Sequence, residues 1–229
     1  TGKGTPAQNI LNLDRDEKVV SIVPCDDYPE GNYLIFVTRN GLIKRTSLKE
    51  YASIHQNGKI AVGLRDGDGL FDVKRTDGNA IVSLASSNGK LVSFQEEEVR
   101  PMGRTATGNK GMDLSDGSSI VGVTTSLEGD KILVLTRLGY GKISYAKDTD
   151  VVSEDGSTRH YDGYRLTHRG AKGVTTLNMT AKNGALVAVR AVNGDEDLLV
   201  ITSTGIVIRT PLSEVKIAGR NTQGVKIIA

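Results

Sequence analysis

The sequence repeats itself about every fifty residues, and this period constrains the fold more than any other feature. Each repeat holds a short β-rich segment, a polar turn with glycine, and a second short segment that contains basic or polar residues. The turn glycines are Gly41, Gly89, Gly139 and Gly205, which lie 48, 50 and 66 positions apart. β-branched residues favour a pleated strand, and glycine supplies the positive φ of a tight turn. The pattern therefore predicts four β-hairpins.

A second glycine-containing element follows each hairpin, at 58–64, 111–114, 173–177 and 224–227, and a related piece opens the chain at 4–11. An acidic turn and another apolar segment come next, which gives four strands per repeat. No segment shows a sustained helical period. Radial repetition of four-stranded blades removes exposed sheet edges, and repeats of this length favour a propeller-like disc over a linear solenoid.

We expect one all-β domain over residues 1–229, built of about four blades. The approximate blade boundaries are 4–57, 58–108, 109–170 and 171–229. The last spacing between glycines is longer because a polar stretch, at about 148–164, is inserted. We expect this insert to be a mobile surface loop.

Composition excludes several classes of protein. Hydrophobic residues make up 38% of the chain, which is enough for a core, but no run approaches the ~18 apolar residues of a membrane-spanning helix. The start, Thr1–Pro6, has no apolar signal segment and no initiator methionine, so we expect a fragment of a longer protein. Cys25 is the single cysteine, which favours a reducing, cytosolic setting.

Catalytic and metal sites find little support in the residue pattern. His55, His160 and His168 have no Cys or His partner at metal-ligand spacing. The segment 66–69 resembles the start of a calcium loop but lacks the later ligands, and we interpret it as a turn. The segment 139–142 resembles a phosphate loop without the helix that would supply amide donors. No Gly-x-Ser-x-Gly elbow occurs. We therefore expect no catalytic residue, metal or cofactor.

The distribution of charge is more informative than its total. Basic and acidic residues number 29 and 27, for a net charge of +2, but the bases return at matching points of the repeat. Hairpin ends carry Lys44, Arg45, Lys90, Lys142 and Arg209. Loops between strands carry Arg100, Arg104, Lys110, Arg165, Arg169, Lys172, Lys216, Arg220 and Lys226. Basic residues at a repeating phase, beside glycines that let backbone approach phosphates, are typical of a nucleic-acid surface.

Three stretches resemble one family. They are residues 33–51, which include Thr-Arg-Asn-Gly-Leu-Ile-Lys-Arg-Thr-Ser-Leu-Lys-Glu-Tyr, and residues 100–112 and 219–225. They are similar to blades of the C-terminal domain of the gyrase A and topoisomerase IV family. The resemblance implies a β-pinwheel, a disc whose neighbouring blades exchange strands and whose basic outer rim wraps double-stranded DNA. The family disc usually has six blades, against four repeats here.

The resemblance also implies a role. The wrapped DNA would support negative supercoiling by an ATP-dependent type IIA topoisomerase, in which the gyrase B subunit hydrolyses ATP and the N-terminal region of gyrase A cleaves DNA. The expected partners are duplex DNA, a second gyrase A chain and the gyrase B subunit, in the bacterial cytoplasm at the nucleoid. The loop His168, Arg169, Gly170, Ala171, Lys172 and Gly173 partly matches the family's Gln-Arg-Arg-Gly-Gly-Lys-Gly box. Its place among the repeats is instead that of a later blade.

Two alternatives stay open. A topoisomerase IV domain would bind DNA without strong wrapping. A protein-interaction propeller would have no nucleic-acid role, and the near-neutral net charge motivates this interpretation. Aromatic residues make up only 4% of the chain and tryptophan is absent, which argues against a surface for single-stranded nucleic acid.

Overall fold

The computed structural model describes residues 4–6, 9–11, 13–14, 16–53 and 58–227. Nearly all of the regular secondary structure in this part of the chain is β-strand, which confirms the predicted all-β fold class. Its helical turns are three short 3₁₀ segments, η2 (Leu48–Tyr51), η3 (Glu96–Glu98) and η4 (Leu212–Glu214). Within the described ranges, no helix has the length and hydropathy that crossing a bilayer would need.

The first three predicted hairpins form the centres of four-stranded sheets. The first sheet has the order β3-β1-β2-β6, with strands β1 (Tyr33–Thr38), β2 (Leu42–Ser47), β3 (Leu70–Thr76) and β6 (Asn109–Lys110). The hairpin turn after β1 passes through Gly41, whose φ of +84° confirms the need for glycine at this point.

Two further sheets repeat this order. The second is β12-β5-β4-β7, with β4 (Ile81–Ser86), β5 (Lys90–Gln95), β7 (Ile120–Thr125) and β12 (Val174–Thr175). The third is β13-β8-β9-β16, with β8 (Lys131–Thr136), β9 (Tyr140–Tyr145), β13 (Leu186–Val192) and β16 (Val225–Lys226). All pairings within the three sheets are antiparallel.

Neighbouring sheets exchange strands. The two-residue strand β6 follows the second hairpin along the chain but pairs with β2 of the first sheet. In the same way β12 pairs with β5, and β16 pairs with β9. Each four-stranded sheet therefore draws strands from more than one of the contiguous ranges that the sequence suggested as blades.

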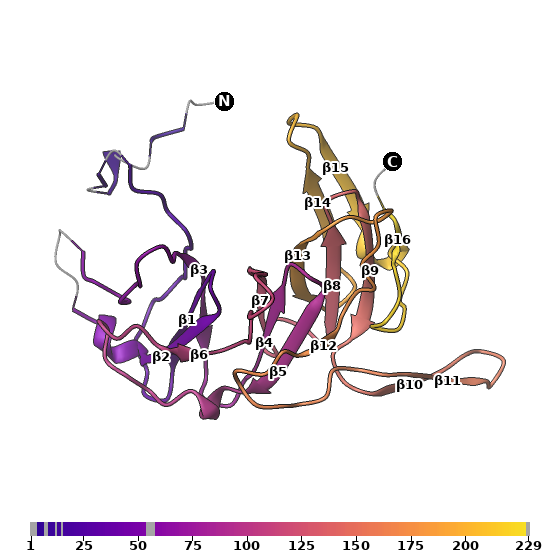
Figure 1. Cartoon of the computed structure of the whole chain (residues 1–229), viewed down its shortest axis with the longest axis horizontal. Helices are drawn as coiled ribbons and strands as arrows, with labels where there is room; N and C mark the ends of the chain where they lie inside the picture. Colours follow the sequence, from indigo (N-terminus) through magenta and orange to yellow (C-terminus); the bar gives the residue numbers. More distant parts are fainter. Residues whose placement is uncertain (1–3, 7–8, 12, 15, 54–57, 228–229) are drawn as a thin grey trace.

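The sheets stand side by side in an arc (Figure 1). Strands β3, β7 and β13 lie toward its concave side, whereas β6, β12 and β16 lie along its convex side. Hydrophobic clusters fill the spaces between neighbouring sheets. One cluster joins Ile35 of β1 to Phe94 of β5, and a second joins Leu91 of β5 to Val134 of β8. The sheets thus stabilise one another face to face.

The fourth repeat and the insert form two-stranded hairpins. Strands β14 (Asp197–Ile201) and β15 (Val207–Pro211) make up the fourth hairpin, where exposed and half-buried residues alternate. The insert, which we expected to be a mobile loop, contains two strands. The insert is a hairpin of β10 (Thr149–Val152) and β11 (Thr158–Tyr161) that projects from the arc (Figure 1), because the Asp155–Ser157 turn lets its polar strands pair.

Candidate nucleic-acid interface

Three segments of eleven residues connect neighbouring sheets, and we call them the crossing loops: 100–110, 165–175 and 216–226. Each leaves the hairpin of one repeat and ends as the outer strand of the preceding sheet. Near its start each loop forms a parallel bridge, between Pro101 and Arg45, Leu166 and Ser93, or Ile217 and Ile143. The three loops therefore share one structural register, which lets their residues be compared position by position.

Equivalent hydrogen bonds hold both ends of each loop. The amides of Met102, Thr167 and Ala218 donate to the preceding sheet at 2.8–2.9 Å. Just past the other end, the amides of Gly111, Thr176 and Ile227 donate to the carbonyls of the turn glycines Gly41, Gly89 and Gly139 at 2.8–2.9 Å. Backbone held in this way presents its side chains in a fixed and repeating geometry.

The close approach of each loop to the preceding sheet requires glycine. Gly108, Gly173 and Gly224 have φ values of +96°, +77° and +75°. A Cβ at Gly173 would lie 2.4 Å from the carbonyl oxygen of Leu91, and one at Gly108 would lie 2.5 Å from that of Ile43. Both the dihedral angle and the space exclude a side chain there.

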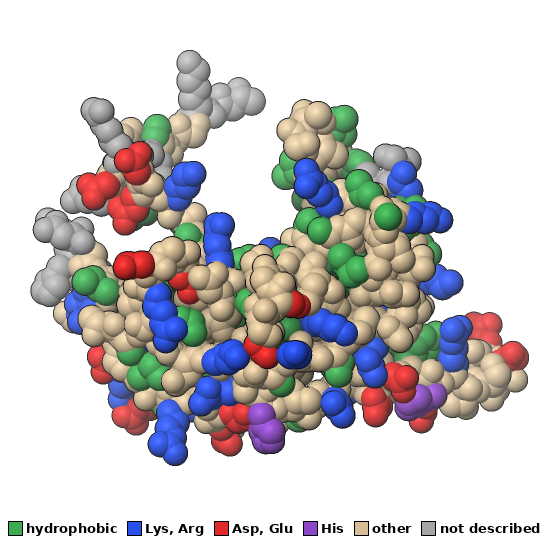
Figure 2. Space-filling view, in the orientation of Figure 1, with side chains coloured by type: hydrophobic (Ala, Val, Ile, Leu, Met, Phe, Trp, Pro, Cys, Tyr) green, Lys and Arg blue, Asp and Glu red, His purple; other side chains and the backbone are tan. Residues whose placement is uncertain are grey.

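Basic residues recur at two positions of this register. The first residue of each loop is Arg100, Arg165 or Lys216, and the fifth is Arg104, Arg169 or Arg220. The three first-position side chains are exposed, and the three arginines at the fifth position are half-buried. Figure 2 shows Lys and Arg side chains along the convex edge of the arc, with acidic side chains between them. The structure thus brings these six predicted residues to equivalent places on successive sheets.

Three other predicted DNA contacts are corrected by the structure. Lys44, Arg45 and Lys142 are only 1%, 6% and 0% exposed, so a duplex cannot reach them. They lie on β2 and β9, each of which has another strand on either side within its sheet. Their charged groups contact protein: Lys44 and Lys142 donate to crossing-loop carbonyls, and Arg45 donates to Glu96. The sequence pattern places them at hairpin ends, but strand exchange buries these ends beneath the crossing loops.

The remaining predicted bases lie on the surface. Lys110, Lys172 and Lys226 are exposed in the second half of the crossing loops. Lys110 pairs with Asp113 at 3.1 Å, and this hydrogen bond lowers the pKa of the Asp113 carboxyl. Arg209 lies outside the crossing loops, on β15.

Arg209 and Lys90, the other predicted bases at hairpin ends, also have protein partners. The exposed Arg209 donates from Nε to the carboxylate of Asp197 at 2.8 Å, a pairing within the β14–β15 hairpin. Lys90 is half-buried and donates from Nζ to Thr175 Oγ1 at 2.9 Å. Neither side chain belongs to the repeating set at the first and fifth loop positions.

The box-like loop at 168–173 lies within the second crossing loop, and Glu98 forms hydrogen bonds to it. The carboxylate of Glu98 accepts the amide of Arg169 at 3.0 Å and contacts Nδ1 of His168 at 3.2 Å. The Arg169 side chain donates to the carbonyls of Glu98 and Lys110, both at 3.1 Å. Sequence reasoning missed Glu98, whose signal was the acidic run at 96–98.

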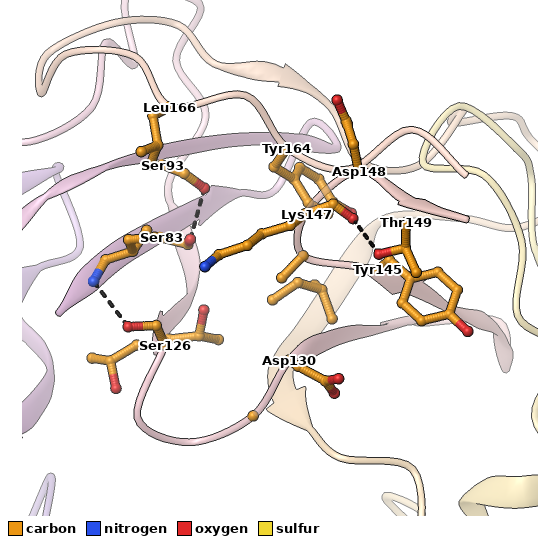
Figure 3. A pocket seen from close by; sticks show the side chains of 16 residues that line it. Ser83, Ser93, Ser126, Asp130, Tyr145, Lys147, Asp148, Thr149, Tyr164 and Leu166 are labelled. Carbon is orange, nitrogen blue, oxygen red and sulfur yellow. Dashed lines mark hydrogen bonds between the residues drawn. The ribbon is translucent and has the colours of Figure 1, made fainter. Parts of the chain in front are cut away.

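The cavity in Figure 3 lies between the second and third sheets and has a volume of about 460 Å³. Its polar groups are largely engaged with one another: the hydroxyls of Ser83 and Ser93 lie 2.7 Å apart, and Thr149 Oγ1 donates to the carbonyl of Lys147 at 2.8 Å. Most of its surface is apolar. We interpret it as a gap in the packing between blades.

The histidines were the residues considered as metal ligands in the sequence. Across residues 4–6, 9–11, 13–14, 16–53 and 58–227, no three His, Cys, Asp or Glu side chains gather as metal ligands would. His160 contacts the carboxylate of Asp150 at 2.6 Å, and this hydrogen bond raises the pKa of the imidazole. His55 lies outside the described residues.

Comparison with known proteins places these features in a family. Curated proteins similar to the chain include the DNA gyrase A subunits of Ureaplasma parvum, 42% identical, of Mycoplasma genitalium, 40% identical, and of Staphylococcus aureus, 36% identical. The alignments cover 99–100% of this chain but only 24–25% of each relative. The chain thus spans about a quarter of the length of these relatives.

Solved structures agree with the fold. The C-terminal domain of a DNA topoisomerase IV matches with a TM-score of 0.83 and 26% identity, covering 98% of this chain and 66% of that one. A DNA gyrase A C-terminal domain matches with a TM-score of 0.81 and 24% identity, covering 99% and 71%. A family model described as "DNA gyrase C-terminal domain, beta-propeller" matches residues 1–26, 32–77, 81–126, 162–193 and 196–229. The chain belongs to the DNA gyrase C-terminal domain family.

Proposed function

We propose that this chain binds double-stranded DNA along the convex edge of the arc and wraps it. The observation that carries the proposal is the register of the crossing loops, which repeats a basic residue at the first and fifth positions on three successive sheets. DNA is held mainly through its phosphates, so a curved row of fixed bases can bind it without reading its sequence.

The energetics are compatible with wrapping. Bending 20–30 base pairs by 40–90° costs on the order of 1–6 kcal/mol. Each phosphate contact releases counterions. The logarithm of the binding constant therefore falls with the logarithm of the salt concentration, with a slope of about −0.9 per contact. Six loop bases would give a slope of about −5, and this much counterion release offsets a bend of that cost at moderate salt.

In the longer protein, we infer, the wrapped segment supports negative supercoiling by DNA gyrase, an ATP-dependent type IIA topoisomerase. The partners there would be a second gyrase A chain and the gyrase B subunit, in the bacterial cytoplasm at the nucleoid. The similarity to gyrase A proteins over the whole of this chain supports the inference. Chemistry would occur elsewhere in the assembly, and this domain would supply the DNA geometry.

The test is a topology assay. The chain is incubated with nicked plasmid, the nick is ligated, protein is removed and the linking number is measured. A shift toward positive supercoils that shrinks as salt rises is the expected result of chiral wrapping. Failure to bind duplex DNA even at low salt would contradict the proposal and favour a protein-interaction propeller.

A second candidate is DNA binding without strong wrapping, as expected for a topoisomerase IV domain. The structural match to a topoisomerase IV C-terminal domain, with a TM-score of 0.83, supports this second candidate. In the same assay this function predicts retention of the plasmid with no change in linking number.

A further inference from the structure

Two lysines occupy the same buried position in the first and third hairpins. Lys44 follows the turn glycine Gly41 by three residues, and Lys142 follows Gly139 by three. Both are completely enclosed, with 1% and 0% of their surface exposed. Burial of an ammonium group is costly unless it is hydrogen-bonded, so their surroundings must supply partners.

Both lysines donate to backbone carbonyls of the crossing loops. Lys142 Nζ donates to the carbonyl of Gly219 at 2.5 Å, and Ser144 beside it donates to that of Ala218 at 2.8 Å. Lys44 Nζ donates to the carbonyl of Arg104 at 2.5 Å and to that of Gly103 at 3.4 Å. Each ammonium thus holds the loop at its fourth or fifth residue.

The fifth residue is the basic one. Gly219 directly precedes Arg220, and Lys44 holds the carbonyl of Arg104 itself. Lys44 also donates to the carbonyl of Ala61 at 2.5 Å, which ties in a third segment of chain. A buried charge therefore lies directly beneath two of the three fifth-position arginines.

The second hairpin provides a comparison within the same chain. Its equivalent position is Val92, which is buried without any charge. There the fifth-position arginine is held from the other side, since Glu98 binds its amide and its Nε donates to the Glu98 carbonyl. A hairpin of this fold therefore does not need lysine at this position, and where lysine occurs its ammonium donates to the crossing loop.

We propose that Lys142 and Lys44 are positioning residues of the DNA interface, which fix the crossing-loop backbone so that Arg220 and Arg104 face the phosphates. The inference rests on the proposed function. Each pair of like charges is unfavourable until a phosphate approaches, so a bound phosphate favours the charged form of the buried lysine beneath it.

The protonation of Lys142 follows from its surroundings. Desolvation, and then the charge of Arg220, lowers its pKa to about 7. Nearby Tyr164 is buried, which raises the pKa of its phenol to about 12, so it stays neutral. Near pH 7.5 the free protein therefore holds Lys142 partly neutral, and DNA binding draws a proton onto it. For Lys44 the same two causes, with Arg104 as the charge, lower the pKa to about 8.

The experiment uses the 229-residue chain with the variants Lys142→Met, Arg220→Ala and their combination. Binding to a duplex is measured by fluorescence anisotropy over a range of salt. Lys142→Met should raise Kd about eightfold at 0.1 M salt and make the salt slope shallower by about one, as Arg220→Ala does. The combination should add little to either change, because the lysine acts through the arginine. Additive losses, or no effect of Lys142→Met, would overturn the proposal.

Calorimetry at pH 7.5 in two buffers of different ionisation enthalpy separates positioning from simple support of the fold. Wild type should take up protons on binding DNA, and Lys142→Met should take up fewer. Equal uptake by both would overturn the proposal. Lys131→Met is the matched control: this lysine lies in the same sheet, but its Nζ binds Asp130 and the carbonyl of Asn193, so binding should not change.

Two further measurements cover a variant that does not fold and a wild-type chain that does not bind. If Lys142→Met does not fold, Lys142→Gln and the pair Lys44→Met with Arg104→Ala carry the same test. If the wild-type chain fails to bind duplex DNA, the proposed function is overturned. If wild type binds and Lys142→Met binds equally well, only the positioning role of Lys142 is overturned.

Discussion

The carboxylate of Glu96 lies 3.4 Å from the guanidinium of Arg45, although the two residues belong to successive repeats. Glu96 is fully buried, and it also accepts the hydroxyl of Thr76 at 2.7 Å and the amide of Ala80 at 2.8 Å. Three elements of the first and second sheets thus meet at one carboxylate. This ion pair joins two blades whose other contacts are mainly apolar.

Removing the carboxylate should destabilise the domain strongly. Glu96→Ala leaves Arg45 buried without its counter-charge, and loss of one partner of a buried pair costs about 3–5 kcal/mol. Urea unfolding followed by circular dichroism measures the change. Glu97→Ala is the matched control, since Glu97 is the exposed neighbour in η3 and its loss should leave stability almost unchanged. Equal effects of the two substitutions would contradict the role of Glu96.

Two glycines separate backbone strain from steric clash. At Gly117, φ is +79° and nothing lies near a built Cβ, so Gly117→Ala should cost only the left-handed conformation, about 1–2 kcal/mol. Gly173 has a similar φ, but its Cβ would meet the backbone of Leu91, which adds about 1–3 kcal/mol of overpacking. The free energies of unfolding of the two variants test the difference. If Gly173→Ala lowers the free energy of unfolding no more than Gly117→Ala does, the second crossing loop does not approach Leu91 as closely as described.

The hairpins were predictable from the sequence because each depends on a local signal. A β-rich segment, a polar turn and a glycine lie within about fourteen residues, and the structure places Gly41, Gly89, Gly139 and Gly205 at φ values of +78° to +84°. The polar insert gave a weaker signal: its pattern identified an interruption of the repeat but not the hairpin of β10 and β11.

The pairing of the outer strands could not be predicted in this way. Strands β6, β12 and β16 have two residues each, too few to show any period, and their partners lie in the preceding repeat. For the same reason the sequence does not reveal the burial of Lys44 and Lys142. A lysine at a hairpin end is normally solvated, and only the strand exchange places a crossing loop above it.

Stability should depend on pH through Lys142. Its pKa in the folded chain is lowered to about 7, from an ordinary value of 10.5. Between these values the unfolded chain binds a proton that the folded chain does not, so stability rises with pH, by up to about 1.4 kcal/mol per pH unit for one such group. Urea unfolding of wild type and Lys142→Met from pH 6 to 10 measures this, and the difference between the two curves should stop changing below pH 7. Parallel curves over the whole range would mean that the pKa of Lys142 is not depressed.

The last prediction concerns the row of exposed bases at the first position of the crossing loops. Arg165→Ala removes one phosphate contact from the proposed path, so Kd for a duplex should rise about eightfold at 0.1 M salt and the salt slope should lose about 0.9. Arg190→Ala is the matched control, because Arg190 is an exposed arginine on β13, at the opposite edge of the third sheet from the crossing-loop strand β16. The loss should be the same for duplexes of different sequence, since phosphates carry no base identity. An equal loss for Arg190→Ala would place DNA on both edges of the sheets and contradict a path confined to the convex edge, whereas a loss that varied with base sequence would indicate groove readout in place of wrapping.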